Sequence, residues 1–110
     1  MKTKDFDSLV VERCEKIKKL LSSKGKEYAS EDERLHNFKA ASAATGRTWE
    51  QALWGIYMKH WVSVQDMVEG ALKPTKELID EKIGDSINYH ILLEALMLER
   101  LTEENKDKDI

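Results

Sequence analysis

The chain has 110 residues, of which 41% are hydrophobic and 35% charged, and its formal net charge is −3. The length suits a single domain over 1–110, and the acidic balance excludes an overall basic field that would attract nucleic acid. No apolar run reaches the roughly 18 residues of a membrane span, so we expect a cytoplasmic protein, and the composition, with one proline and five glycines, favours an all-α fold.

The first predicted helix covers 6–22 and has one apolar stripe that includes Phe6, Val10 and Ile17. The single cysteine, Cys14, excludes an intramolecular disulfide and fits a reducing compartment. Its apolar neighbours indicate a small buried hydrophobe rather than a nucleophile. Gly25 is a natural helix breaker, so we expect a polar connection from Lys24 onward.

A short second helix is predicted from Leu35 to Ala44, and Gly46 ends it. Ser30 and Glu33 have the spacing of a capping box ahead of this helix.

Thr48 and Gln51 repeat that spacing and open a third helix, which ends at Gly70. Trp54 and Trp61 are about two turns apart, so they form an aromatic ridge on one face. The ridge suits either internal packing or an interface between copies of the chain.

The fourth helix is predicted from Lys76 to about Thr102, with Thr75 as its cap and a frayed, charged tail over 105–110. The expected fold therefore has four helices, with the third and fourth, both long, paired antiparallel. Such a domain encloses a thin core, so we expect a homo-oligomer.

Polar residues interrupt the apolar stripe of the fourth helix. Glu81, Asp85 and Asn88 share a face with Leu78 and Leu92, because they step by three or four residues. Unpaired buried carboxylates are unfavourable, so the stripe predicts a cation, hydrogen-bond donors or a wet cavity. The alternative is that the acids lie at the exposed rim of the core.

A second polar stripe on the third helix contains Lys59, Ser63 and Asp66, with Glu69 one turn further on. Antiparallel pairing would bring Asp66 and Glu69 near Glu81 and so gather the oxygen ligands that Mg²⁺ prefers. A salt bridge between Glu81 and Lys59 is the competing interpretation.

Two lysines beside a glycine, Lys24 and Lys26, could approach a phosphate, and Asn37 is a further candidate near this segment. A solvated loop is the alternative. His36, His60 and His90 lack a second ligand at zinc spacing. For His60 we expect a hydrogen-bonded place in the core or at an interface.

Four segments together resemble a known group of proteins: Lys24-Gly25-Lys26-Glu27-Tyr28, His36-Asn37-Phe38, Lys59-His60 with Asp66, and Glu81-Lys82-Ile83-Gly84-Asp85 with Ile87-Asn88-Tyr89. The chain resembles small phage and prophage proteins of Gram-positive bacteria over roughly Lys24 to Leu98. Those proteins are similar to the nucleotide-modification-associated domain family and, more remotely, to the all-α nucleoside triphosphate pyrophosphatases of the MazG and dimeric dUTPase type.

The resemblance implies a MazG-like helical bundle that binds a (deoxy)nucleotide with Mg²⁺. Glu81 and Asp85 match the outer acids of the family motif, Asp66 and Glu69 match its first motif loosely, and Lys82 replaces an acid. The implied metal ligands are therefore Glu81, Asp85, Asp66 and Glu69, and the implied phosphate or nucleotide contacts are Lys24, Lys26, Lys59, Asn37 and Asn88. A non-enzymatic helical protein that binds a host or phage partner is the alternative function.

Overall fold

The computed structural model describes the backbone of residues 1–28 and 33–108, and the side chains of 1–22 and 33–106. These ranges contain four α-helices and no strand, which confirms the all-α prediction. Contacts divide the chain into an N-terminal unit, Met1–Arg34, and a C-terminal unit, Leu35–Ile110. The prediction of one domain stays a prediction. Within the described parts, no helix combines the length and the apolar character required to cross a membrane.

The N-terminal unit consists mainly of helix α1, Thr3–Tyr28, which has 26 residues. It continues past the predicted end at Ser22 and includes Gly25, because one glycine costs a helix only about 1 kcal/mol. The expected burial of Cys14 is also wrong, since this side chain is exposed. Phe6 and Val10, on the predicted apolar stripe, are 55% and 46% exposed.

Helices α2, His36–Thr45, and α3, Trp49–Glu69, belong to the C-terminal unit. The capping box of Thr48 and Gln51 is present as predicted, with both hydrogen bonds formed. Gly46 and Gly70 follow the two helices with φ of 70° and 84°. This left-handed backbone favours glycine, which explains why both predicted stops are correct.

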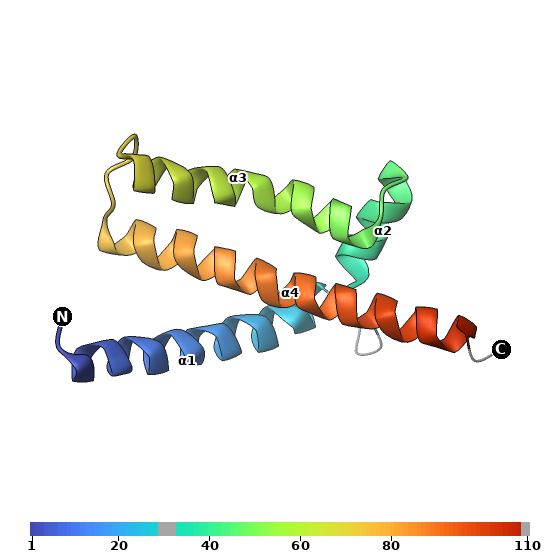
Figure 1. Ribbon diagram of the computed structural model, residues 1–110, viewed down its shortest axis with the longest axis horizontal. Helices are drawn as coiled ribbons and strands as arrows, with labels where there is room; N and C mark the ends of the chain where they lie inside the picture. The colour runs from blue at the N-terminus through green and yellow to red at the C-terminus, as the bar shows by residue number, and fades with distance from the viewer. Residues whose placement is uncertain (29–32, 109–110) are drawn as a thin grey trace. The chain divides into compact units, whose positions relative to one another are not determined.

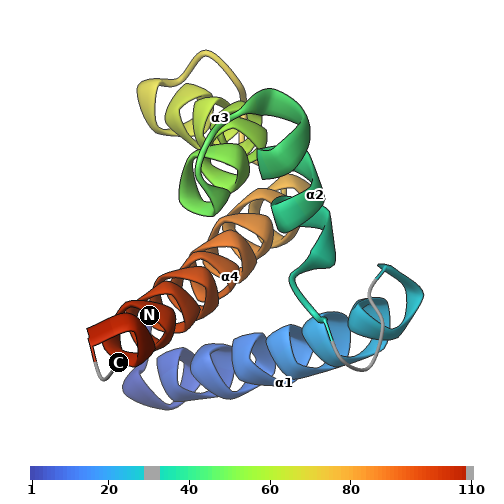
Figure 2. The ribbon, with the colours of Figure 1, turned by 90° about the vertical axis from the view of Figure 1, so that its right-hand side faces the viewer.

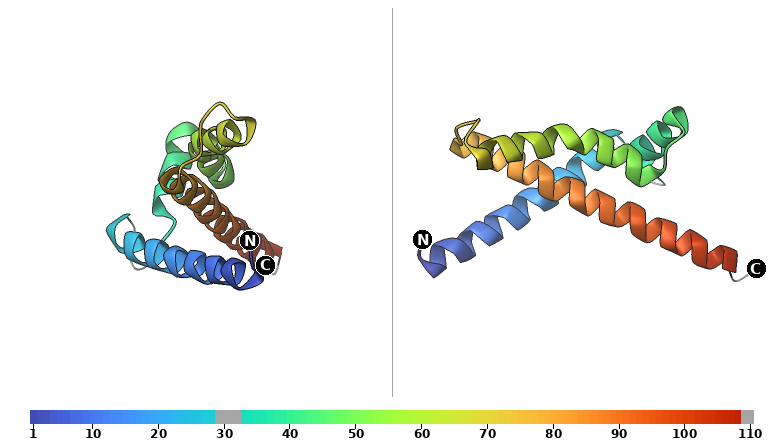
Figure 3. Two further views of the ribbon diagram at one scale, coloured as in Figure 1. Left: turned by 90° about the vertical axis from the view of Figure 1, so that its left-hand side faces the viewer. Right: turned by 45° about the horizontal axis from the view of Figure 1, so that its top comes forward.

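Helix α4, Lys76–Lys108, has 33 residues and runs antiparallel to α3, as Figure 1 shows. Thr75 caps it by accepting a hydrogen bond from the backbone N–H of Leu78 at 3.1 Å. The helix continues beyond the predicted end at Thr102, because Glu and Lys favour helix and no glycine or proline stops it. Its C-terminal part therefore extends past the start of α3 (Figure 3).

The core of the C-terminal unit lies where α3 and α4 pack together. Leu53 of α3 and Leu96 of α4 are fully buried, and Tyr57 and Leu35 complete the cluster. Helix α2 packs against α3 near the N-terminal end of α3. Figure 2 looks nearly along the axis of α3 and shows the two helices side by side. Packing around Leu53 and Leu96 sets the register between α3 and α4, and that register determines which polar side chains meet.

Candidate functional site

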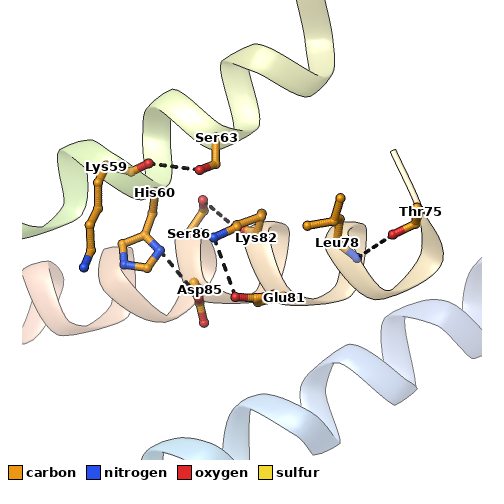
Figure 4. A network of polar contacts seen from close by, with 9 residues as sticks. All are labelled: Lys59, His60, Ser63, Thr75, Leu78, Glu81, Lys82, Asp85 and Ser86. Carbon is orange, nitrogen blue, oxygen red and sulfur yellow. Dashed lines mark hydrogen bonds and ion pairs between the residues drawn. The ribbon is translucent and has the colours of Figure 1, made fainter. Parts of the chain in front are cut away.

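Polar side chains from α3 and α4 face each other near the middle of the helical hairpin. Figure 4 shows this polar seam, which we define by Lys59, His60 and Ser63 of α3 and Glu81, Lys82, Asp85 and Ser86 of α4. Ser63 and Ser86 donate hydrogen bonds to the backbone carbonyls one turn earlier, at 3.1 and 2.9 Å. The two hydroxyls are thus satisfied within their own helices, and the charged groups make the remaining contacts.

Each carboxylate of the seam has a basic group beside it. Nδ1 of His60 lies 3.5 Å from Oδ2 of Asp85, and Nζ of Lys82 lies 3.6 Å from Oε1 of Glu81. The structure therefore pairs Glu81 with Lys82 rather than with Lys59, its partner in the competing interpretation. Both separations exceed ordinary hydrogen-bond length, so neither carboxylate is tightly held.

Burial increases along the predicted stripe of α4. The side chain of Glu81 is 59% exposed and that of Asp85 31%, whereas Asn88 is only 7% exposed as a residue. The alternative that the acids lie at the rim is thus correct for Glu81, while Asn88 is inside. A carboxylate at the rim and another partly inside can both reach a bound ligand.

Two buried polar atoms near the seam make no hydrogen bond with any described residue. They are Oδ1 of Asn88 and Nδ1 of His60. Leaving a buried polar atom unsatisfied costs about 1–3 kcal/mol, and such atoms are rare in folded proteins. Asn88 lies one turn from Asp85 on α4, and Nδ1 of His60 faces the same carboxylate from α3.

Aromatic rings line the side of the seam toward the core. Tyr89 stacks at 5.0 Å on His60 and at 5.6 Å on Tyr57, measured between ring centroids. Burial raises the pKa of the Tyr89 hydroxyl, and the negative charge of Asp85 raises it further. Tyr89 therefore stays neutral at physiological pH and forms an uncharged, aromatic side of the seam near Asp85.

The donor set of the seam fits one particular kind of metal site. Within the described residues, no three His, Cys, Asp or Glu side chains are arranged to hold a metal ion. Mg²⁺, however, is usually bound by one or two carboxylates, several waters and the phosphates of a substrate. Glu81 and Asp85, one turn apart, are the candidate carboxylates of the seam for that role, and a site made of four carboxylates stays a prediction.

The remaining predicted residues lie in different places. Asp66 and Glu69 lie in the last part of α3, and Asn37 lies exposed near the start of α2. Lys59 is exposed and extends from α3 beside His60 (Figure 4). The side chains of Lys24 and Lys26 lie outside the described residues, as does Ser30 of the first predicted capping box.

Sequence reasoning missed the roles of His60 and Tyr89 in this seam. We expected His60 to be hydrogen-bonded, but its Nδ1 makes no such bond and faces Asp85. No local sequence signal could have found the pairing of His60 with Asp85, because it depends on the register between α3 and α4.

Comparison of the chain with models of protein families, with curated proteins and with solved structures gives no match.

Proposed function

We propose that this is a phage-encoded protein of nucleotide metabolism, which binds a (deoxy)nucleotide together with Mg²⁺ at the polar seam. The observation that supports it is the stripe of Glu81, Asp85 and Asn88, two carboxylates followed by a buried amide with an unpartnered oxygen. Proteins break a consistent apolar pattern mainly where function requires it. The MazG resemblance supplies the ligand class, a nucleotide with Mg²⁺. The protein would act in the cytoplasm of the bacterial host.

In this proposal Glu81 and Asp85 hold the metal, and Asp66 and Glu69 are further candidate ligands. When bound, Mg²⁺ would neutralise phosphate charge and orient the phosphates. Lys59 would bind phosphate oxygens, since a lysine ammonium is a compact positive charge, and the phosphate contacts expected of Lys24 and Lys26 stay predictions. Asn88 would contact the base or sugar, and Asn37 stays a further candidate contact to the nucleotide.

Hydrolysis of the α–β phosphoanhydride is a separate question from binding. The resemblance implies a pyrophosphohydrolase in which water is the nucleophile. Lys82 replaces an acid of the family motif, which removes a ligand and adds positive charge. Nucleotide binding tolerates that change better than turnover does, so binding is the part of the proposal to test first.

The decisive experiment compares wild type with Asp85→Asn by calorimetric titration of Mg²⁺ and a deoxynucleoside triphosphate. The amide has nearly the same shape as the carboxylate but lacks its charge. We therefore expect an intact fold and a loss of binding by at least about tenfold. Glu94→Gln is the matched control, because Glu94 is an exposed acid of α4 that lies off the stripe. Equal affinity in wild type and Asp85→Asn would exclude the proposed site.

A second candidate function is supported by exposed apolar side chains. Trp61 and Val68 of α3 are 44% and 78% exposed, and Met97 and Leu98 of α4 are 52% and 58% exposed. Apolar surface of this kind suits a helical protein that binds a host or phage protein. Mg²⁺ with a nucleotide would raise the melting temperature under the first proposal and leave it unchanged under the second.

A further inference from the structure

Helix α1 carries an apolar stripe that remains exposed. This α1 stripe lies on one face, because its members recur at helical spacing: Phe6, Leu9, Val10, Ile17 and Leu20. The first three are 55%, 47% and 46% exposed, and no described side chain of α1 is buried. Helices in proteins gain most of their stability by packing an apolar face. Since α1 is the only helix among the described residues of the unit Met1–Arg34, its stripe requires a partner surface.

Charge is divided between the two halves of α1. Residues 5–15 contain four acids and one base, a net charge of −3, whereas residues 16–22 contain three lysines and no acid, a net charge of +3. Two acids and two lysines of these halves flank the stripe and are exposed: Asp5, Asp7, Lys16 and Lys18. Each edge of the stripe is therefore acidic in its first half and basic in its second.

We infer that the α1 stripe binds the α1 stripe of a second copy of this chain, with the two helices antiparallel. In that arrangement the acidic half of each helix lies beside the basic half of the other, along both edges of the interface. A parallel pair would place acid beside acid and lysine beside lysine, which repel each other. Charge complementarity thus favours both this partner and this direction.

The apolar side chains fit one register of the antiparallel pair. With Arg13 at the two-fold axis, Phe6 lies level with Leu20 of the second copy, and Leu9 lies level with Ile17. The contact then extends about 25 Å along the helices, at 1.5 Å per residue, and excludes the two lysines that precede the acidic half. The long side chain of arginine can reach past the apolar contacts to the carboxylates beside them.

The first test compares two neighbouring valines. Val10 belongs to the stripe, whereas Val11 is 62% exposed and points about 100° away around the helix. Light scattering and analytical ultracentrifugation of the full chain, with and without Trp61→Glu, separate this association from that of the α3 ridge. Val10→Asp should weaken dimerisation by at least about tenfold, because its carboxylate would be desolvated without a partner. Val11→Asp introduces the same charge and should leave dimerisation unchanged.

The second test reverses charges and then mixes the variants. One variant combines Asp5→Lys with Asp7→Lys, and the other combines Lys16→Glu with Lys18→Glu. Each alone places like charges opposite each other and should dimerise about tenfold more weakly than wild type. An equimolar mixture opposes unlike charges again, so its affinity should return to within about threefold of wild type. A stripe covered within its own chain would give no such recovery, because mixing changes nothing inside a chain.

The inference is overturned by any of three results. These are a mixture of the two charge variants that stays monomeric, a Trp61→Glu chain that is monomeric by itself, and a monomeric chain that instead binds phosphatidylglycerol vesicles through the stripe. Should circular dichroism show that Val10→Asp loses helix, the mixing test still decides, because both charge variants retain every apolar residue of the stripe.

Discussion

Tyr89 connects the polar seam to the aromatic core, and its ionisation is disfavoured in the folded chain. Burial raises the pKa of its hydroxyl above the ordinary value of 10.0, and the charge of Asp85 adds to the effect. The unfolded chain therefore loses this proton at a lower pH than the folded one. The resulting contribution to stability is fully present below about pH 10 and is lost as the pH rises through the raised pKa.

Tyr89→Phe should accordingly make unfolding less sensitive to alkaline pH. We expect the melting temperature of wild type to fall more steeply between pH 9 and pH 11 than that of Tyr89→Phe, because phenylalanine has no proton to release. Thermal unfolding followed by far-ultraviolet circular dichroism measures both slopes. Parallel curves for the two proteins would mean that Tyr89 ionises as readily in the folded state as in the unfolded state.

Asn88 offers a test in which stability and binding change in opposite directions. Its Oδ1 atom is buried without a hydrogen-bond partner among the described residues. Replacement by an apolar side chain of similar size removes that penalty, so Asn88→Leu should be more stable by about 1 kcal/mol. The same change should weaken nucleotide binding, as titration calorimetry would show. A less stable Asn88→Leu would indicate that the amide is structurally satisfied.

The polar stripe of α4 could be predicted from sequence because it depends only on helical periodicity. Its partners on α3 could not be predicted in the same way. Which side chain meets Asp85 is set by how far α3 slides along α4, and that register depends on packing around Leu53 and Leu96. The sequence therefore predicted Glu81, Asp85 and Asn88 as a group, and left His60, the partner of Asp85 on α3, undetected.

At the scale of elements, a charged clamp around Trp49 joins α2, α3 and α4. Lys39 and Arg100 lie on the ring of Trp49, 4.6 and 4.8 Å from its centroid. Each cation also binds a carboxylate at 2.7 Å, Lys39 with Glu99 and Arg100 with Glu50. Two cation–π contacts and two ion pairs thus hold the open end of the hairpin, where α2 packs.

Glu50 makes the clamp sensitive to acid. Burial alone would raise the pKa of its carboxyl group, but hydrogen bonding to Arg100, a backbone hydrogen bond and the positive charge of Arg100 bring the pKa below its ordinary value of 4.5. A lowered pKa in the folded state stabilises the protein above about pH 4.5. That contribution is lost as the pH falls through the lowered value.

Glu50→Gln should therefore destabilise the protein at pH 7 by about 1 kcal/mol, and by less at pH 3, where the wild-type carboxylate is becoming protonated. Urea unfolding at the two pH values measures the difference. Glu12→Gln is a suitable control, because its ion pair with Lys16 joins exposed side chains within one helix. An equal loss at both pH values would contradict the role of the Glu50 charge.

Helix ends show where local sequence suffices and where it does not. The caps at Thr48 and Thr75 and the stops at Gly46 and Gly70 were predictable, because each depends on neighbouring residues alone. The ends of α1 and α4 were predicted too early. Gly25 and the charged tail weaken a helix without ending it, since the surrounding residues favour helix strongly enough to continue.

At the scale of the whole molecule, the aromatic ridge of α3 remains partly uncovered. Trp54 and Trp61 are 43% and 44% exposed, and Trp54 also contacts Tyr57 and the edge of His90. Trp49 is partly buried against the core cluster, so it belongs to the packing instead. Exposed tryptophans carry much of the binding energy in protein interfaces, and we therefore propose that the ridge joins copies of this chain in a homo-oligomer.

Trp61→Glu should then produce a smaller species, because a carboxylate at the interface would be desolvated without a partner. Multi-angle light scattering at micromolar concentration measures the mass of wild type and variant directly. Ile56→Glu is the matched control: it adds the same charge to α3 at a side chain that is 40% exposed but lies on a different face from Trp54 and Trp61. We expect its mass to equal that of wild type. A wild type that is already monomeric would exclude homo-oligomerisation through α3.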